Sequence, residues 1–231
     1  SKSGVELPAY TSFREAGWHK LPLPDKQNIM FADFRRDPDQ YPLKTPSGKI
    51  EVFSSTVASF AYDDCLGHPA WFAPPEWLGA AEDTYPLHLL SNQPRTKLHS
   101  QLDQGPVAAA AKIKGREEVQ MHKDDAAARG IEDGDIIRLF NARGAIYVGV
   151  RITDQIRHGV VMVPTGAWLD LDKDDPELCK HGNPNMLAPD RPTSKLAQGP
   201  AAHSCLVQAE AVDQTRLPEV TAFIPPVIEK G

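Results

Sequence analysis

Cysteine is scarce in this sequence, with only Cys65, Cys179 and Cys205 among 231 residues. Three cysteines so widely spaced exclude a disulfide framework and a CxxC metal motif. Cys179 lies two residues before His181, but two potential ligands without further partners do not make a metal site. We therefore predict no metal ligands in this chain.

Long hydrophobic runs and blocks of basic residues are also missing. No apolar run reaches the roughly 18 residues that a membrane-spanning helix needs. We therefore expect no membrane-spanning helix. The first ten residues, SKSGVELPAY, lack the apolar core of a signal peptide. A net charge of −6 and a pI near 5.7 argue against a nucleic-acid-binding surface. These features do not distinguish between the periplasm and the cytoplasm as the cellular compartment.

Two regions of different texture make up the sequence. Residues 1–84 hold nine of the 21 prolines and many aromatic side chains, with candidate strands only near Lys49–Ser54. This composition predicts an irregular arm, the remnant of a preceding domain, whose aromatic side chains pack against another part of a larger protein. Residues 216–231 are expected to form a C-terminal tail.

Residues 85–215 show short apolar runs separated by Gly, Pro, Asn and Asp. Runs at 86–90, 136–140, 145–153 and 160–163 have the length and alternation of strands, and DDAAARG at 124–130 predicts one short helix. Short strands with turn punctuation and few helices indicate a closed or nearly closed β-barrel. The predicted fold class is therefore mainly β with short helices.

Three polar segments follow apolar runs and form the candidate binding site. They are SNQPRTKLHSQ at 91–101, PTGAWLD at 164–170 and HGNPNMLAPDRPTSKLAQGPAAH at 181–203. Side-chain amides offer paired donors and acceptors that suit the edge of a heterocycle. The alternative is that Asn and Pro only build turns. Likewise, Trp168 and Asp170 fit a pocket wall and an acceptor for the N–H groups of a heterocycle, or equally a buried Trp and a turn Asp.

The order of these segments resembles a known family. SNQPRTKLHSQ, DAAARGIEDGDIIRLFNARGAI, PTGAWLD, HGNPN and TSKLAQG are similar to the C-terminal part of molybdopterin oxidoreductases of the dimethyl sulfoxide reductase family. Within that family they look most like the biotin sulfoxide and trimethylamine N-oxide reductases. TPSGKIEVFS and GHPAWFAPPEWLGA resemble the preceding run, so the resemblance covers roughly residues 45–210.

The resemblance implies a six-stranded double-psi β-barrel that binds and encloses a cofactor. In the full-length enzyme that cofactor is molybdenum bis(molybdopterin guanine dinucleotide), which carries the redox chemistry. Gln93 and His99 correspond to contact residues in the first segment, and Asn183 or Asn185 together with Gln198 to those in the second. Neighbours that complete the site are Ser91, Asn92, Arg95, Ser100, Gln101, Trp168, Asp170 and Gly199.

The same resemblance implies that the chain works with N-terminal domains of its own polypeptide. In these reductases the serine that binds molybdenum and the path for a small S-oxide or N-oxide substrate lie upstream. We therefore expect no catalytic residue in this chain, and neither activity nor cofactor in the chain alone. Two alternatives remain: the same domain of a formate dehydrogenase or nitrate reductase type enzyme, and a non-enzymatic β-barrel that binds a protein.

Overall fold

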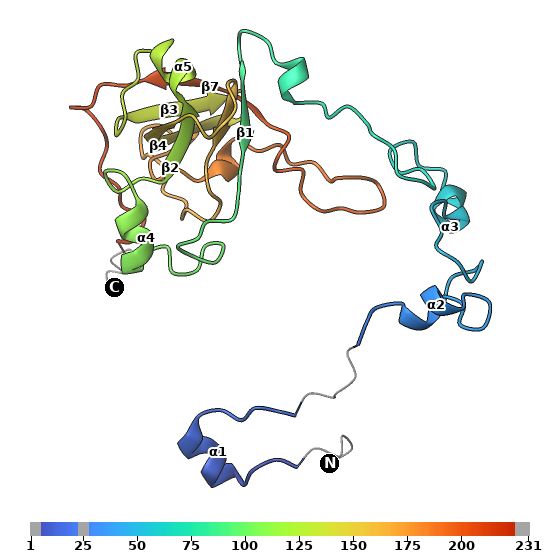
Figure 1. Cartoon of the computed structure of the whole chain (residues 1–231). Helices are drawn as coiled ribbons and strands as arrows, with labels where there is room; N and C mark the ends of the chain where they lie inside the picture. The colour runs from blue at the N-terminus through green and yellow to red at the C-terminus, as the bar shows by residue number, and fades with distance from the viewer. Residues whose placement is uncertain (1–5, 23–27, 225–231) are drawn as a thin grey trace, which may run out of the picture. The chain divides into compact units, whose positions relative to one another are not determined.

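The structure is a computed structural model that describes residues 6–22 and 28–224 (Figure 1). It divides into two compact units, Ser1–Ser54 and Ser55–Gly231. Residues 1–5 and 23–27 of the predicted arm, and residues 225–231 of the predicted tail, lie outside the described residues.

The first unit holds the helices α1 (Tyr10–Ala16) and α2 (Ala32–Arg36), and neither contributes a buried residue. The predicted strand near Lys49–Ser54 is wrong, because these residues form turns and irregular backbone. Their polar groups bond locally: Thr45 Oγ1 donates to the Lys49 carbonyl at 2.6 Å, and the Ser47 N–H donates to Glu51 at 2.8 Å. A strand needs a neighbouring strand for its backbone, and this segment has none among the described residues.

The second unit begins with α3 (Ser55–Ser59) and the 3-10 helix η1 (Leu78–Ala80). Between these helices the chain is irregular, and Gly67 is the first buried residue among those described. Glu76 then ties the segment to the barrel, since both carboxylate oxygens accept from Arg143, at 2.7 and 2.8 Å. The contacts thus group residues 55–84 with the barrel, and the arm boundary at residue 84 stays a prediction.

Six strands close a β-barrel, which confirms the predicted double-psi fold (Figure 1). They are β1 (Leu87–Leu90), β2 (Glu118–His122), β3 (Ile136–Asn141), β4 (Gly144–Thr153), β5 (Val160–Met162) and β7 (Leu206–Ala211). Their order is β2-β5-β1-β7-β3-β4, and pairing of β4 with β2 closes the ring. β1–β5 and β2–β4 are parallel, whereas the other pairs in the ring are antiparallel.

Shorter elements decorate the barrel. β6 (Leu178–Cys179) pairs in parallel with β4 outside the ring. The helices are α4 (Pro106–Ala111), α5 (Lys123–Ala127), which confirms the predicted short helix, and η2 (Pro184–Met186). The few and short helices agree with the predicted fold class.

The barrel interior explains the alternation seen in the sequence. Ile146, Val148 and Val150 of β4 are fully buried, and Ile137 and Leu139 of β3 meet them in the same core cluster. Successive side chains of a strand point to opposite faces, so every second residue fills the barrel. The core is thus confined to one closed barrel, and the polar segments between its strands are left at its ends.

Candidate functional site

The first polar segment, residues 91–101, directly follows β1. The side chains of Gln93, Arg95 and His99 are exposed and make no hydrogen bond within the described part of the chain. Ser100 and Gln101 are exposed as well. The segment therefore presents donors and acceptors that are available to a ligand.

Backbone contacts hold the start of this segment. The Ser91 N–H donates to His203 Nδ1 at 3.4 Å, and the Asn92 carbonyl accepts from the Thr165 N–H at 2.9 Å. Asn92 Oδ1 is buried without a partner among the described residues. A buried amide oxygen without a donor is costly, so Asn92 is suited to accept a hydrogen bond from a ligand.

The turn at 164–170 lies against the first segment. Trp168 Nε1 donates to the Ser100 carbonyl at 2.7 Å. Gly166 has φ +97°, and a Cβ on it would lie 1.7 Å from the His99 carbonyl oxygen, so the close approach requires glycine. These contacts bring Trp168 next to His99 and Ser100. The Trp168 side chain is 37% exposed, which leaves part of the indole free to line a site.

Asp170 lies in the same turn but is already engaged. Its oxygens accept from the Thr221 N–H and Thr221 Oγ1, both at 2.7 Å, and Lys180 Nζ lies 3.3 Å away. Burial raises the pKa of this carboxyl, but hydrogen bonds from Thr221 and Lys180 lower it more, so the net shift is downward. Phe223 then packs on Trp168 with ring centroids 5.3 Å apart. The proposed role of Asp170 toward guanine stays a prediction.

The second polar segment begins on the barrel. His181 is fully buried, and Gly182 packs so closely on β4 and on the residue before β2 that a Cβ would lie 2.8 Å from Glu117 Cβ. Asn183 Oδ1 accepts from the Asn185 N–H at 3.0 Å and thereby caps η2. The Asn185 side chain is exposed. Asn183 is therefore partly used for structure, whereas Asn185 is available.

The later part of the same segment forms an irregular hairpin away from the barrel core (Figure 1). Pro192 and Pro200 form an isolated bridge, and the Thr193 N–H donates to the Gly199 carbonyl at 2.8 Å. Gln198 and Gly199 are exposed. Lys195 pairs with Asp63 at 2.7 Å. No hydrogen bond or ion pair joins Gln198 or Gly199 to the first segment within the described residues, so the predicted site is only partly assembled there.

The sequence interpretation missed a buried group of charges at the end of the first segment. Lys97 Nζ contacts both Asp103, at 2.7 Å, and Glu117. Lys112 Nζ contacts the same two carboxylates, at 2.8 and 3.1 Å. None of the four side chains is more than 7% exposed. We call these four residues the charge cluster.

Asp103 extends the charge cluster to the two other candidate segments. Its Oδ2 accepts from the Trp168 N–H at 3.0 Å and lies 3.8 Å from His181 Nδ1. Burial raises the Asp103 pKa, but hydrogen bonds from Lys112, Lys97 and the Trp168 N–H lower it more, and the net shift is downward. The carboxylate is thus held in its charged form.

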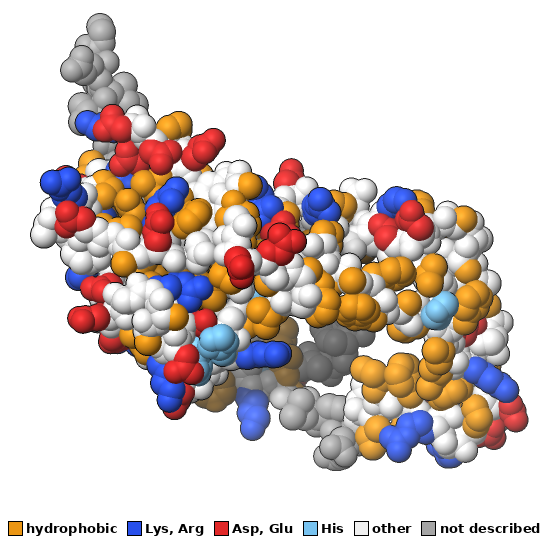
Figure 2. Space-filling model, turned by 90° about the horizontal axis from the view of Figure 1, so that it is seen from above, with side chains coloured by type: hydrophobic (Ala, Val, Ile, Leu, Met, Phe, Trp, Pro, Cys, Tyr) orange, Lys and Arg blue, Asp and Glu red, His pale blue; other side chains and the backbone are white. Residues whose placement is uncertain are grey.

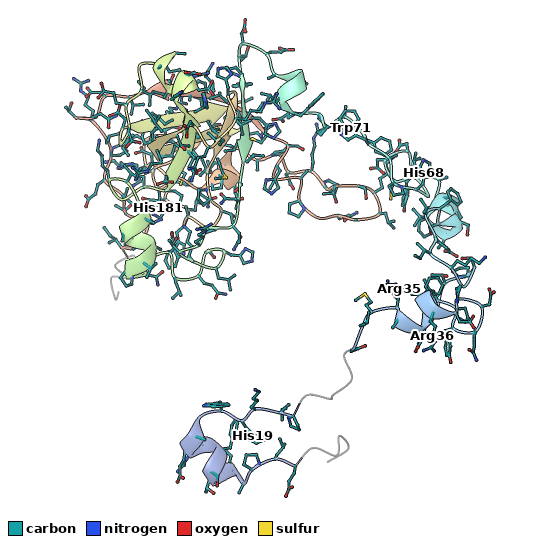
Figure 3. The ribbon with its side chains drawn as sticks, in the orientation of Figure 1. His19, Arg35, Arg36, His68, Trp71 and His181 are labelled. Atoms are coloured by element: carbon teal, nitrogen blue, oxygen red, sulfur yellow. The ribbon has the colours of Figure 1, made fainter. Side chains whose placement is uncertain are left out.

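His181 lies at the end of the barrel that carries α4 (Figure 3). Burial lowers its pKa, and the nearby charge of Lys112 adds to this effect. Neutral His181 donates from Nδ1 to the Trp168 carbonyl at 3.0 Å, which leaves Nε2 as an acceptor. His181 Nε2 is buried without a partner in the described chain, and Phe223 packs edge-on 5.0 Å from the ring.

A cleft of about 630 Å³ opens between residues 63–76 and the base of the hairpin. Phe72, several prolines, Arg191 and His203 line it. His203 also accepts from the Ser91 N–H, so the cleft borders the first candidate segment. Its walls combine apolar surface with the cation of Arg191, the imidazole of His203 and the carboxylates of Asp63, Asp64 and Glu76.

Neither a metal cluster nor a membrane span is found in the part of the chain that the structure describes. No group of three or more His, Cys, Asp or Glu side chains there could hold a metal ion, and Cys179 is buried in β6. Among those same residues, 6–22 and 28–224, no helix has the length and hydropathy to cross a bilayer.

Known proteins have sequences that are similar to this chain over most of its length. The chain is 45% identical over 207 residues to biotin sulfoxide reductase of Cereibacter sphaeroides, which is 89% of this chain and 27% of that protein. It is 43% identical over 233 residues to trimethylamine-N-oxide reductase 1 of Escherichia coli O157:H7, 97% of this chain and 27% of that protein. The chain thus spans about a quarter of the length of these relatives.

The fold is also found in a solved structure. Acetylene hydratase from Pelobacter acetylenicus aligns with 76% of this chain and 25% of its own, with a TM-score of 0.61 and 19% sequence identity, which speaks for the fold alone. Residues 87–206, which include the whole barrel except most of β7, match the model of the molydopterin dinucleotide binding domain. The resemblance inferred from the sequence is confirmed, and the chain belongs to the family of molydopterin dinucleotide binding domains.

Proposed function

We propose that this chain is the C-terminal cofactor-binding part of a molybdenum-dependent S-oxide or N-oxide reductase. The observation that carries the proposal is the free polar surface of the first segment: Gln93, Arg95 and His99 are exposed and unpaired among the described residues, in the segment whose Ser100 carbonyl accepts from Trp168 Nε1. Relatives with 43–45% identity are named for reduction of biotin sulfoxide and trimethylamine N-oxide.

The residues present suit molybdopterin guanine dinucleotide. Pterin and guanine edges alternate donors and acceptors, which the amides of Gln93 and Asn185 match in bidentate fashion. Arg95 offers a planar cation for a pyrophosphate oxygen. Among the residues that the structure describes, Asn92 Oδ1 is a buried acceptor without a donor, as expected where a ligand completes the site.

The bound cofactor supplies the two-electron chemistry, and this chain supplies binding and orientation. His99 and Gln93 hold one face of the ligand, and Asn185 and Gln198 extend the site along the second segment. Trp168 excludes water beside them. Because these residues supply only part of the cofactor's surroundings, the chain alone is expected to retain no molybdenum and to show no reductase activity.

Exposed aromatic side chains support a partner within the same polypeptide. Hydrophobic side chains are spread over the surface (Figure 2), and before the barrel they include Tyr10, Trp18, Phe31, Phe53 and Trp71, each at least half exposed. Exposed apolar surface of this kind is typical of a contact that another domain covers. We propose that N-terminal domains of the longer protein cover it.

The test measures molybdenum and guanine nucleotide in the purified full-length protein. The wild-type protein is expected to contain both, and His99→Ala with Asn185→Ala to lose most of each. Every lost hydrogen bond costs roughly 0.5–3 kcal/mol, so a double change weakens retention by about one to four orders of magnitude if the effects add. Thr193→Ala, on the hairpin, is the control. If the double variant contains as much molybdenum and guanine nucleotide as the wild-type protein, these segments only form turns and do not bind the cofactor.

A further inference from the structure

We propose that the buried ion pair between Lys97 and Asp103 is a positioning device that sets the first polar segment against Trp168 and His181. This inference rests on the proposed cofactor function. Neither residue touches the expected ligand site through an exposed atom, because Lys97 is 1% exposed and Asp103 is fully buried at the side chain.

The geometry converges on the Asp103 carboxylate. Oδ1 accepts from Lys97 Nζ at 2.7 Å, and Lys97 belongs to the segment that carries Gln93 and His99. Oδ2 accepts from the Trp168 N–H at 3.0 Å. One side chain therefore fixes two of the three candidate segments, and it lies 3.8 Å from His181 at the start of the third.

Burial makes this arrangement rigid. Two lysines and two carboxylates alternate in the charge cluster, and each lysine contacts both carboxylates. A buried charge without a partner is strongly unfavourable, so the segment cannot shift Lys97 away without a large cost. A site built from loops keeps its geometry only when supporting contacts lock those loops.

A comparison of Lys97 with Lys112 distinguishes the positioning role from a general contribution to stability. Lys112 makes the same two kinds of contact as Lys97, but it follows α4 and belongs to no candidate segment. The chain thus contains its own control: two lysines of one cluster with side chains only 1% and 3% exposed, of which Lys97 alone anchors a predicted ligand segment.

The experiment compares two matched double variants in the full-length protein. Lys97→Met with Glu117→Gln removes the anchor of the first segment and leaves Lys112 paired with Asp103. Lys112→Met with Glu117→Gln removes the same charges and leaves Lys97 paired with Asp103. We expect the Lys97 double variant to retain guanine nucleotide and molybdenum at least about tenfold less tightly, which corresponds to ~1.4 kcal/mol.

The control is expected to retain wild-type loading, with thermal midpoints of the two double variants within about 3 °C of each other. Equal loss of cofactor in both double variants would overturn the inference, as would full retention in both. If either fails to fold, Lys97→Gln and Lys112→Gln replace them, and the same order of retention is expected.

A second measurement does not depend on cofactor. Amide hydrogen exchange of cofactor-free protein should be about tenfold faster at Trp168 and Thr165 in the Lys97 variant than in the Lys112 variant, with β3 and β4 amides unchanged. Equal exchange in the two variants would contradict the inference. Wild-type protein that lacks molybdenum and guanine nucleotide would instead contradict the proposed function, and the exchange comparison would still decide the role of Lys97.

Discussion

Two parts of the polar segment 181–203, a first half at 181–187 and a second half at 192–200, have similar polar sequences but opposite structural settings. The first half, 181–187, is built into the barrel: His181 and Leu187 are fully buried, and Gly182 packs against β4 and against Glu117, just before β2. The second half, 192–200, is an exposed hairpin held by its own backbone hydrogen bonds and by the pair of Lys195 with Asp63.

The difference shows that composition does not decide whether a polar segment is rigid. Asn141 of β3 determines where the first half ends, because its Nδ2 donates to the carbonyls of Leu187 and Leu206, at 2.9 and 3.1 Å. No comparable buried side chain holds the hairpin within the described chain. The rigid half can orient a ligand before it binds, whereas the hairpin is suited to adapt to one.

Glycine substitutions should separate the two halves most clearly. Gly182→Ala places a methyl group 2.8 Å from Glu117 Cβ at φ +94°, and crowding with backbone strain should cost about 2–4 kcal/mol. Gly199→Ala places it 3.8 Å from Thr193 Oγ1 and should change stability by less than about 0.5 kcal/mol. Urea unfolding of both variants checks this. Equal costs would contradict the comparison.

Asparagine substitutions test the anchor next. Asn141→Ala removes two donors from buried carbonyls and the acceptor of the Arg143 N–H, and should destabilise the barrel by about 2–3 kcal/mol. Asn183→Ala removes the cap of η2 and should cost about 0.5–1 kcal/mol. Denaturant midpoints of the two variants show which one loses more stability. A larger loss of stability for Asn183→Ala would assign the anchoring role to η2.

The pH dependence of stability tests the burial of His181. Its folded pKa lies below the ordinary value because burial disfavours the imidazolium. The unfolded state therefore binds more protons below pH ~6.5, and stability falls as pH decreases, by at most about 1.4 kcal/mol per pH unit for one group. His181→Gln should flatten this slope in the range directly below about pH 6.5. An unchanged slope would show that other groups cause it.

The sequence predicted the barrel better than it predicted the site. Strands with strong alternation, such as β4, were recognised, and the closed barrel is confirmed. β2 and β7 were missed because EVQMH and LVQAEA are short and mix charged or small residues with apolar ones. Their strand conformation depends on the neighbours that they pair with, and pairing is a long-range property.

The charge cluster escaped prediction for a related reason. Lys97, Asp103, Lys112 and Glu117 each look like ordinary surface residues in the sequence, since these types are rarely buried unless they are paired. Their partners are separated by up to 20 residues along the chain. The exposed residues Gln93, Arg95 and His99 could be named from local chemistry, whereas the buried residues that position them could not.

The smallest effect is expected from Lys195→Ala in the hairpin. Lys195 and Asp63 are 55% and 80% exposed at the side chain, so solvent and salt screen their attraction. The Lys195 N–H still donates to Asp64 at 3.0 Å after the change, and the backbone bonds of Thr193 and Ser194 keep the hairpin paired. The thermal midpoint should therefore not change measurably, and hydrogen exchange should rise only in residues 192–200. A clear fall in the midpoint would show that the hairpin contributes to the folded barrel, and the contrast between the two halves of the segment would be lost.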